Sequence, residues 1–301
     1  MKRVLVLYYS QSGDVRSALE ALVAPMRAPD VEIRWQPVDT VPRYPFPWGA
    51  HEFFDCMPEA VGGHAPQLAP MELNPGERFD LVILGWQVWF LSPSLPIQAF
   101  FAAPQAQVLR GTRVISVTCC RQMWQRAHGT LRELVSRADG VLTDSIVLTH
   151  QGGSLAGYLT APRLMITGRR DKLGLLPAGG VACGDIDALS RFGQRLRETK
   201  DRWSEPQPGP MISDLEPVEV NAAAVLAELA VIPPVVLLAR LARLCGGPGN
   251  PARRPVLWLF VLMLVVFLPV LLPASAVLAP LVRRRLTRRL ARGLPGVRDV
   301  T

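Results

Sequence analysis

Val4-Leu-Val-Leu-Tyr-Tyr-Ser-Gln-Ser-Gly-Asp14 and Leu81-Val-Ile-Leu-Gly-Trp-Gln-Val-Trp-Phe-Leu-Ser-Pro-Ser-Leu-Pro96 are the two stretches that decide the fold of this chain. Each is a nearly continuous apolar run that ends in small, polar or aromatic residues, and a helical pattern follows it. Such runs are typical of parallel strands buried on both faces of a sheet. The two stretches therefore predict neighbouring strands that hold a ligand at their carboxyl ends.

Strand-like and helix-like segments alternate through the first two thirds of the chain. Further strands are predicted at residues 31–35, 114–117 and 145–149, and helices are predicted over residues 14–24, 94–101, about 124–136 and 185–200. Asp14 is expected to cap the first helix, and the stretch 42–58 to form an ordered loop. Strands separated by helices form parallel sheets. We therefore expect a flavodoxin-like three-layer α/β sandwich with a five-stranded parallel sheet in the order 2-1-3-4-5.

A turn rich in serine follows the first predicted strand and consists of Ser10, Gln11, Ser12, Gly13, Asp14 and Val15. The helix that starts here offers unpaired backbone N–H groups and the positive end of its dipole, and the two serine hydroxyls add donors. The glycine allows the backbone to close around an anion. The turn is therefore predicted to bind a phosphate group without any lysine.

Aromatic and small residues end the next two central strands at the same edge of the sheet. They are Trp86, Gln87, Val88, Trp89 and Phe90 after one strand, and Thr118, Cys119, Cys120 and Arg121 at the end of the other. A flat isoalloxazine ring needs apolar or aromatic walls and amide N–H groups, and open α/β sheets bind ligands at this switch point. With the phosphate turn, these residues predict an FMN site. The alternative for each aromatic residue is an ordinary place in the core.

His150 is the candidate general base, because it directly follows the last predicted strand and has an unperturbed pKa near the useful range. Its alternative role is structural. Tyr158 and Arg163 lie in a Gly- and Leu-rich insertion at residues 151–183, which we expect to cover the site as a lid.

The composition near the C-terminus is that of a membrane-associated segment. Residues 255–282 contain no charge, residues 220–239 contain only Glu228, and an arginine-rich run follows at 283–289. The positive-inside bias disfavours a single span with the first domain in the cytoplasm. Either residues 220–239 form a first span, or Pro269 and Pro273 bend the long segment into a re-entrant hairpin. Both place the protein at the cytoplasmic face of the inner membrane.

Charge and cysteine usage exclude several other classes of protein. Nine of the 33 Lys and Arg residues lie within residues 252–301 against one acid, so the preceding part of the chain is neutral and no nucleic-acid partner is expected. Five cysteines without CxxC spacing and without a leader peptide fit a reducing compartment, and no metal site is expected. We divide the chain into an FMN domain (1–204), a linker (205–219) and a membrane-associated region with an Arg-rich tail (220–301).

Six motifs in roughly residues 1–185 occur together in this chain. They are Tyr8-Tyr-Ser-Gln-Ser-Gly13, Tyr44-Pro-Phe-Pro-Trp48, Phe53-Phe-Asp-Cys-Met-Pro58, Gln87-Val-Trp-Phe-Leu-Ser-Pro-Ser94, Cys120-Arg-Gln-Met-Trp124 and Ile166-Thr-Gly-Arg-Arg-Asp171. In these motifs the chain resembles a bacterial flavodoxin-like family, that of the dialkylresorcinol condensing enzymes, which accompany ketosynthases in flexirubin and aryl-polyene pigment pathways.

The resemblance implies an FMN-dependent aromatase that oxidises a dialkylcyclohexanedione-type intermediate to a dialkylresorcinol. It also implies a substrate with apolar chains, contact with membrane lipid, and a ketosynthase and an acyl carrier protein as partners. One alternative is a membrane-attached quinone reductase that uses NAD(P)H. Another is an electron carrier or a flavin-free scaffold in a pigment-synthesis complex. Val15 favours the scaffold, because flavodoxins usually have Thr or Ser at this position and valine supplies no hydroxyl donor for the phosphate.

Overall fold

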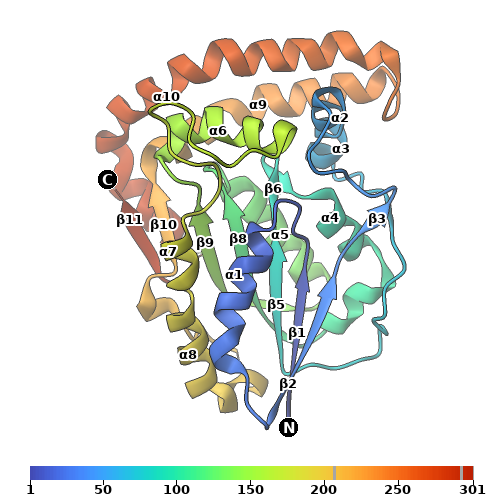
Figure 1. The fold of residues 1–301 in the computed structure, drawn as a ribbon, viewed down its shortest axis with the longest axis vertical. Helices are drawn as coiled ribbons and strands as arrows, with labels where there is room; N and C mark the ends of the chain where they lie inside the picture. Colours follow the sequence, from blue (N-terminus) through green and yellow to red (C-terminus); the bar gives the residue numbers. More distant parts are fainter. Residues whose placement is uncertain (206–207, 292–293, 301) are drawn as a thin grey trace.

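A seven-stranded parallel sheet forms the centre of the molecule (Figure 1). The computed structural model describes residues 1–205, 208–291 and 294–300. The strands of the sheet are β1 (Lys2–Tyr8), β2 (Val31–Pro37), β5 (Leu81–Trp86), β8 (Arg113–Cys120), β9 (Val141–Thr149), β10 (Val218–Asn221) and β11 (Val297–Val300). They lie in the order β11-β10-β9-β8-β5-β1-β2, and each neighbouring pair is parallel.

The first five strands of this sheet have the order β2-β1-β5-β8-β9, which is the 2-1-3-4-5 order of the flavodoxin-like fold. The predicted fold is therefore confirmed. The predicted number of strands is too small, because β10 and β11 extend the sheet beyond β9. In β10, Val218 and Val220 are fully buried while Glu219 between them is exposed, as the two-residue period of a strand requires.

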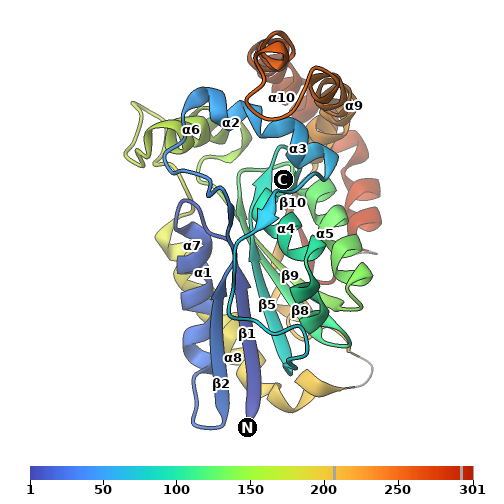
Figure 2. The same cartoon turned by 90° about the vertical axis from the view of Figure 1, so that its right-hand side faces the viewer.

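Helices cover both faces of the sheet (Figures 1 and 2). One layer contains α1 (Asp14–Val23), α7 (Cys183–Asp187) and α8 (Ser190–Glu198), and it packs on one hydrophobic cluster. The other layer contains α4 (Leu95–Ala102) and α5 (Gln125–Arg137), and it packs on a second cluster. The single helix predicted over 185–200 is thus divided between α7, α8 and a 3-10 turn at Lys200–Ser204.

Three further helices follow β2 or β9 and lie above the strand ends (Figure 1). They are α2 (Ala50–Asp55), α3 (Met57–Gly62) and α6 (Gly153–Thr167). The prediction of an ordered loop at 42–58 is therefore wrong for its second half, where Phe53, Phe54 and Met57 pack into hydrophobic clusters. The remaining short elements are β3 (Thr40–Val41), β4 (Gln67–Leu68), β6 (Val88–Trp89), β7 (Ser92–Pro93) and the 3-10 turns Ala24–Met26, Pro104–Leu109, Ser213–Leu215 and Pro251–Arg253.

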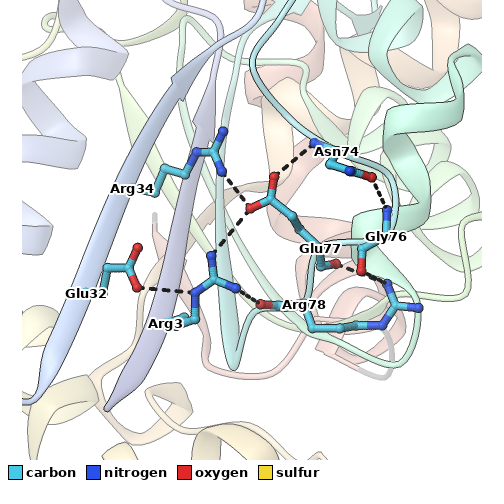
Figure 3. A network of polar contacts seen from close by, with 7 residues as sticks. All are labelled: Arg3, Glu32, Arg34, Asn74, Gly76, Glu77 and Arg78. Atoms are coloured by element: carbon cyan, nitrogen blue, oxygen red, sulfur yellow. Dashed lines mark hydrogen bonds and ion pairs between the residues drawn. The ribbon is translucent and has the colours of Figure 1, made fainter.

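A network of charged residues closes the amino edge of the sheet next to β1 and β2 (Figure 3). The Glu77 carboxylate accepts hydrogen bonds from the Arg34 and Arg3 guanidiniums, at 2.6 and 3.4 Å, and from the Asn74 N–H group at 3.0 Å. The Asn74 bond and the two arginines hold the pKa of Glu77 below its ordinary value. These contacts join β1, β2 and the loop before β5, and the predicted site lies at the opposite edge of the sheet.

Two long C-terminal helices, α9 (Ala222–Leu244) and α10 (Arg254–Ala291), form an antiparallel pair (Figure 1). By length and composition, both are apolar and long enough to cross a membrane. Of the two alternatives, the re-entrant hairpin at Pro269 and Pro273 is wrong, because both prolines lie inside α10 and the hairpin turn lies between α9 and α10. Of the arginine-rich tail, residue Arg292 and the side chains of Arg289 and Arg298 lie outside the described residues.

Candidate active site at the carboxyl edge of the sheet

The serine-rich turn leads from β1 into α1 at the carboxyl edge of the sheet. Gly13 is the N-cap of α1 and has a φ of 94°, a left-handed conformation that favours glycine. The prediction that Asp14 caps this helix is wrong, because Asp14 is the first residue of the helix and no side chain caps it. The Ser10 hydroxyl accepts a hydrogen bond from the Arg16 N–H group at 3.1 Å, and this bond holds the turn against the helix.

Arg170 from the insertion reaches this turn. Its Nη1 atom lies 2.6 Å from the Asp14 carboxylate, and its Nη2 atom donates to the Ser12 carbonyl. Asp14 is almost fully buried, while the Arg170 side chain is partly exposed. Beside the two serines, the turn therefore holds one negative and one positive charge that balance each other.

The loop that follows β5 lies beside the serine-rich turn. The Gln11 N–H group donates to the Gln87 side-chain oxygen at 3.2 Å, and the Tyr9 N–H group donates to the Gly85 carbonyl at 3.0 Å. The ring centroids of Tyr9 and Trp89 are 5.7 Å apart. The two stretches that predict the fold are thus brought together at the point between β1 and β5 where the strand order reverses.

The aromatic residues of this loop are packed against other protein side chains. Trp89 is 8% exposed, and its ring contacts Tyr9, Tyr44 and Trp48 with centroids 5.0 to 5.7 Å away. Trp86 is fully buried and tilts toward His128 of α5, in the layer opposite α1. The Trp86 and Trp89 side chains therefore belong to the hydrophobic core, as the alternative interpretation states. A flavin at this loop would contact backbone groups and the partly buried side chains of Val88 and Phe90.

The predicted residues at the end of β8 are divided between the two faces of the sheet. Cys119 belongs to the cluster beneath α1, whereas Cys120 belongs to a cluster with Trp124 and the residues of β10. Thr118, one position before Cys119, faces the same side as Cys120 because side chains alternate along a strand. Burial raises the pKa of both thiols, and nearby Asp14 adds to this for Cys119. Neither cysteine is therefore a thiolate nucleophile.

His150 lies near the serine-rich turn. Burial lowers its pKa to about 4, with further lowering by the Arg121 and Arg170 guanidiniums and an opposing effect of Asp14. The imidazole is therefore neutral at physiological pH, and its buried Nδ1 atom has no hydrogen-bond partner among the described residues. The His150 N–H group donates to the Cys120 carbonyl at 2.8 Å. His150 thus lies between the serine-rich turn and the end of β8, and its role in catalysis stays a prediction.

The insertion lies over the carboxyl edge of the sheet (Figure 1). The Met165 carbonyl at the end of α6 accepts a hydrogen bond from the Trp48 N–H group at 2.8 Å, and the Gly180 carbonyl accepts one from Gln151. Gly180 has a φ of 99°, which favours glycine, and a Cβ atom there would lie 2.6 Å from Arg170 Nη1 and displace this side chain. Arg163 instead pairs with Asp171 on the surface, and the Tyr158 side chain lies outside the described residues.

The residues of the turn fit a phosphate group. The N–H groups of Asp14 and Val15 precede the first intrahelical bond, which runs from Ser17 N–H to the Gly13 carbonyl, and they form no bond to the described residues. A Cβ atom on Gly13 would meet nothing within 4 Å, so the turn borders open space. Buried Gln11 Oε1 also lacks a partner among the described residues. Val15 is fully buried and supplies no hydroxyl donor, while Arg170 supplies a charge that the sequence pattern lacks.

Comparison with known proteins gives several similar structures. No protein-family model and no curated protein matches the chain. A flavoprotein in complex with FMN from Lactobacillus acidophilus NCFM is 23% identical over 49% of this chain and 93% of its own, with a TM-score of 0.35. An archaeal flavodoxin is 12% identical over 66% and 99% (TM-score 0.36), and an azoreductase from Bacillus anthracis str. Sterne is 8% identical over 64% and 99% (TM-score 0.35). The fold assignment therefore rests on the strand order of the chain itself.

Sequence reasoning missed Arg170 and the aromatic side chains around Trp89. Arg170 lies in the Gly-Arg-Arg-Asp run directly after α6, and a basic pair at the end of an insertion near a phosphate turn was the available signal. Tyr44 and Trp48 lie in the stretch between β3 and α2, where proline and aromatic residues alternate without a period.

Proposed function

We propose that this chain is an FMN-dependent oxidoreductase attached to a membrane surface. The observation that carries the proposal is the contact between the two strand-end turns, where the Gln11 N–H group donates to the Gln87 side chain at 3.2 Å. In flavodoxin-like sheets this switch point is where FMN binds. We infer that the α1 N-terminus, the two serines and Arg170 hold the phosphate, and that the loop after β5 flanks the ring.

The substrate we propose is a dialkylcyclohexanedione-type ring, which is oxidised to a dialkylresorcinol. Bound FMN would supply the two-electron acceptor for this reaction, in which the ring loses one proton and one hydride. The residues of the chain would orient the ring, exclude water and accept the proton. Neutral His150, whose Nδ1 atom is unpartnered among the described residues, is the candidate acceptor. The family resemblance and the apolar surroundings of the site support this substrate class.

An aromatic path connects the candidate site with α10. The Phe90 ring lies 5.2 Å from Phe53, 6.5 Å from Phe54 and 5.8 Å from Phe260 of α10, between ring centroids. Substrates with long alkyl chains partition into membranes. We propose that the alkyl chains lie along the partly exposed surface of this packed aromatic cluster while the ring enters the site.

The experiment that tests the proposal measures flavin bleaching in anaerobic protein loaded with FMN. A synthetic dialkylcyclohexanedione is expected to reduce the flavin without a nicotinamide and to yield the resorcinol. Rapid bleaching by NADPH followed by quinone turnover, with no effect of the dione, would instead identify a quinone reductase. Protein that takes up no FMN would identify a scaffold.

A further inference from the structure

Helix α9 and the first part of α10 lie across the carboxyl edge of the sheet, and the last turns of α10 bend down beside β10, where Leu286 and Leu290 pack (Figures 1 and 2). The N-terminus of α9 and the C-terminus of α10 are both joined to the sheet, because β10 leads into α9 and β11 follows α10. These two strands are parallel neighbours. The pair is therefore tied to the folded domain at both of its ends.

The hairpin turn between α9 and α10 is also fastened to the domain. Arg253 is fully buried, and its guanidinium lies 2.7 Å from the Glu59 carboxylate and 3.1 Å from the Asp55 carbonyl. The Gly249 N–H group donates to the Asp55 carboxylate at 2.7 Å. Asp55 and Glu59 belong to α2 and α3, so these contacts hold the hairpin turn against the domain that carries the candidate site.

Helix α9 contacts the domain along its length. Buried residues recur in successive turns from Ala222 to Ala242. In the second turn of the helix, the buried Glu228 carboxylate accepts hydrogen bonds from the N–H groups of Gln125 and Arg126 at the start of α5, at 3.1 and 2.6 Å. A bilayer-crossing α9 would have to break these contacts and leave a carboxylate in lipid.

The opposite side of the pair exposes large apolar side chains. On α10, Trp258 is 69% exposed, Val270 70% and Leu281 80%, whereas Leu257, Phe260, Leu268 and Leu272 face the protein and are buried. The other exposed apolar residues of the pair are Leu229, Leu237, Leu241, Leu244, Leu259, Leu262, Val265, Val266, Phe267, Val277 and Leu278. Soluble proteins rarely expose so many apolar side chains on one surface.

The charge around this surface has one sign. No Asp or Glu occurs from residue 229 to residue 298, and arginines lie near both ends of the pair. Those with described side chains that are not buried are Arg240, Arg243, Arg254, Arg283, Arg284, Arg285 and Arg288. Cationic side chains at the rim of an apolar surface complement the headgroups of anionic lipids.

We propose that α9 and α10 form an in-plane anchor that enters one leaflet of an anionic bilayer and does not cross it. The anchor turns the carboxyl edge of the sheet, with the candidate site, toward the lipid. The inference rests on the proposed function for the membrane attachment. The in-plane orientation is inferred from the contacts of Arg253 with Asp55 and Glu59, which hold the hairpin turn against the domain.

The test is labelling of a cysteine in the hairpin turn with a membrane-impermeant maleimide. Gly247→Cys suits this purpose because Gly247 is exposed and a Cβ atom there would meet nothing within 4 Å. The full chain, also carrying Cys245→Ser, is added to preformed vesicles of equal parts phosphatidylcholine and phosphatidylglycerol. Native Cys183, exposed on α7, reports the side on which the domain lies.

An in-plane anchor predicts that Cys183 and Gly247→Cys are labelled to the same extent on intact vesicles, within about twofold. A hairpin that crosses the bilayer predicts labelling of Gly247→Cys only after detergent is added, and that result would overturn the inference. Failure of the protein to float with the anionic vesicles would also overturn it. The flavin absorbance of the same sample tests the proposed function separately, since labelling does not depend on FMN.

Trp258 gives a second measurement that does not use a cysteine variant. It is the strongly exposed tryptophan of α10, whereas Trp86, Trp124 and Trp203 are at most 2% exposed. Lipids brominated near the headgroup are expected to quench Trp258 fluorescence more than lipids brominated near the end of the acyl chain. The difference is expected to disappear in Trp258→Phe, and stronger quenching from the bilayer centre would contradict an in-plane anchor.

Discussion

Arg170 Nη1 lies 2.6 Å from Asp14 Oδ1, although 156 positions separate the two residues in the sequence. The pair joins the insertion to the serine-rich turn at the N-terminus of α1. An acid in this turn would repel a phosphate group, and the guanidinium neutralises it. The insertion is therefore part of the candidate phosphate site and not only a cover above it.

Replacement of Arg170 by alanine is expected to weaken FMN binding about tenfold or more, because a charge-assisted contact to the phosphate and the neutralisation of Asp14 are both lost. Titration of the flavin-free protein with FMN measures the effect. Arg163→Ala is the matched control, since Arg163 comes from the same insertion but pairs with Asp171. Riboflavin has no phosphate, so equal losses for FMN and riboflavin would contradict the assigned role.

Replacement of Asp14 by asparagine is expected to tighten FMN binding about tenfold, because a buried negative charge is removed next to the phosphate. The amide oxygen can still accept a hydrogen bond from Arg170. The same titration measures the change. Weaker FMN binding by the variant would mean that the carboxylate acts mainly by holding Arg170 in place.

Gly13→Glu is expected to abolish FMN retention, because it places bulk and negative charge in the turn. The substitution also strains the backbone, since Gly13 has a φ of 94°. Gly111→Glu controls for this: Gly111 has a φ of 66°, borders open space and lies just before β8, at the opposite edge of the sheet. Loss of FMN from both variants to the same degree would show that strain alone explains the effect.

The contribution of His128 to the stability of the fold is expected to fall as the pH decreases below the ordinary pKa of histidine. Burial lowers the pKa of His128 from 6.5 to about 4, and His128 contacts the Ser145 hydroxyl at 2.8 Å. Between these two values the unfolded chain binds a proton that the folded chain does not bind. The contribution of His128 to stability therefore decreases as the pH falls through this window, by about 2 kcal/mol between about pH 7 and about pH 5.

Thermal unfolding in detergent at the two pH values measures this loss. His128→Gln is expected to reduce the pH dependence, because glutamine does not titrate and can still bond Ser145. His51→Gln, on the exposed side of α2, is the control and should retain the full dependence. An unchanged pH dependence in His128→Gln would contradict the assigned pKa.

The central sheet could be predicted from the sequence because its strands are buried on both faces. The runs that begin at Val4 and Leu81 are apolar throughout, and in the structure they pair as β1 and β5. Strands β10 and β11 contain four residues each and adjoin a long apolar segment. Their pairing is decided by tertiary contacts, so local sequence does not reveal them.

The contents of the candidate site were only partly predictable. The serine-rich turn follows from local rules, but the Asp14–Arg170 pair depends on how an insertion folds back over the sheet. The position of the hairpin turn was marked by Gly246-Gly-Pro-Gly-Asn-Pro251, a stronger turn sequence than the isolated prolines of α10. A proline in a long apolar helix does not end it when neighbouring helices support the backbone.

The binding of FMN by the purified full-length protein tests the central claim most directly. We predict a yellow protein that releases FMN on denaturation, and a flavin-free form that takes up FMN in equal amounts and prefers it to riboflavin. The preference reports the phosphate contact at residues 10–15. A colourless protein that takes up no FMN, or one that binds riboflavin equally well, would contradict the account.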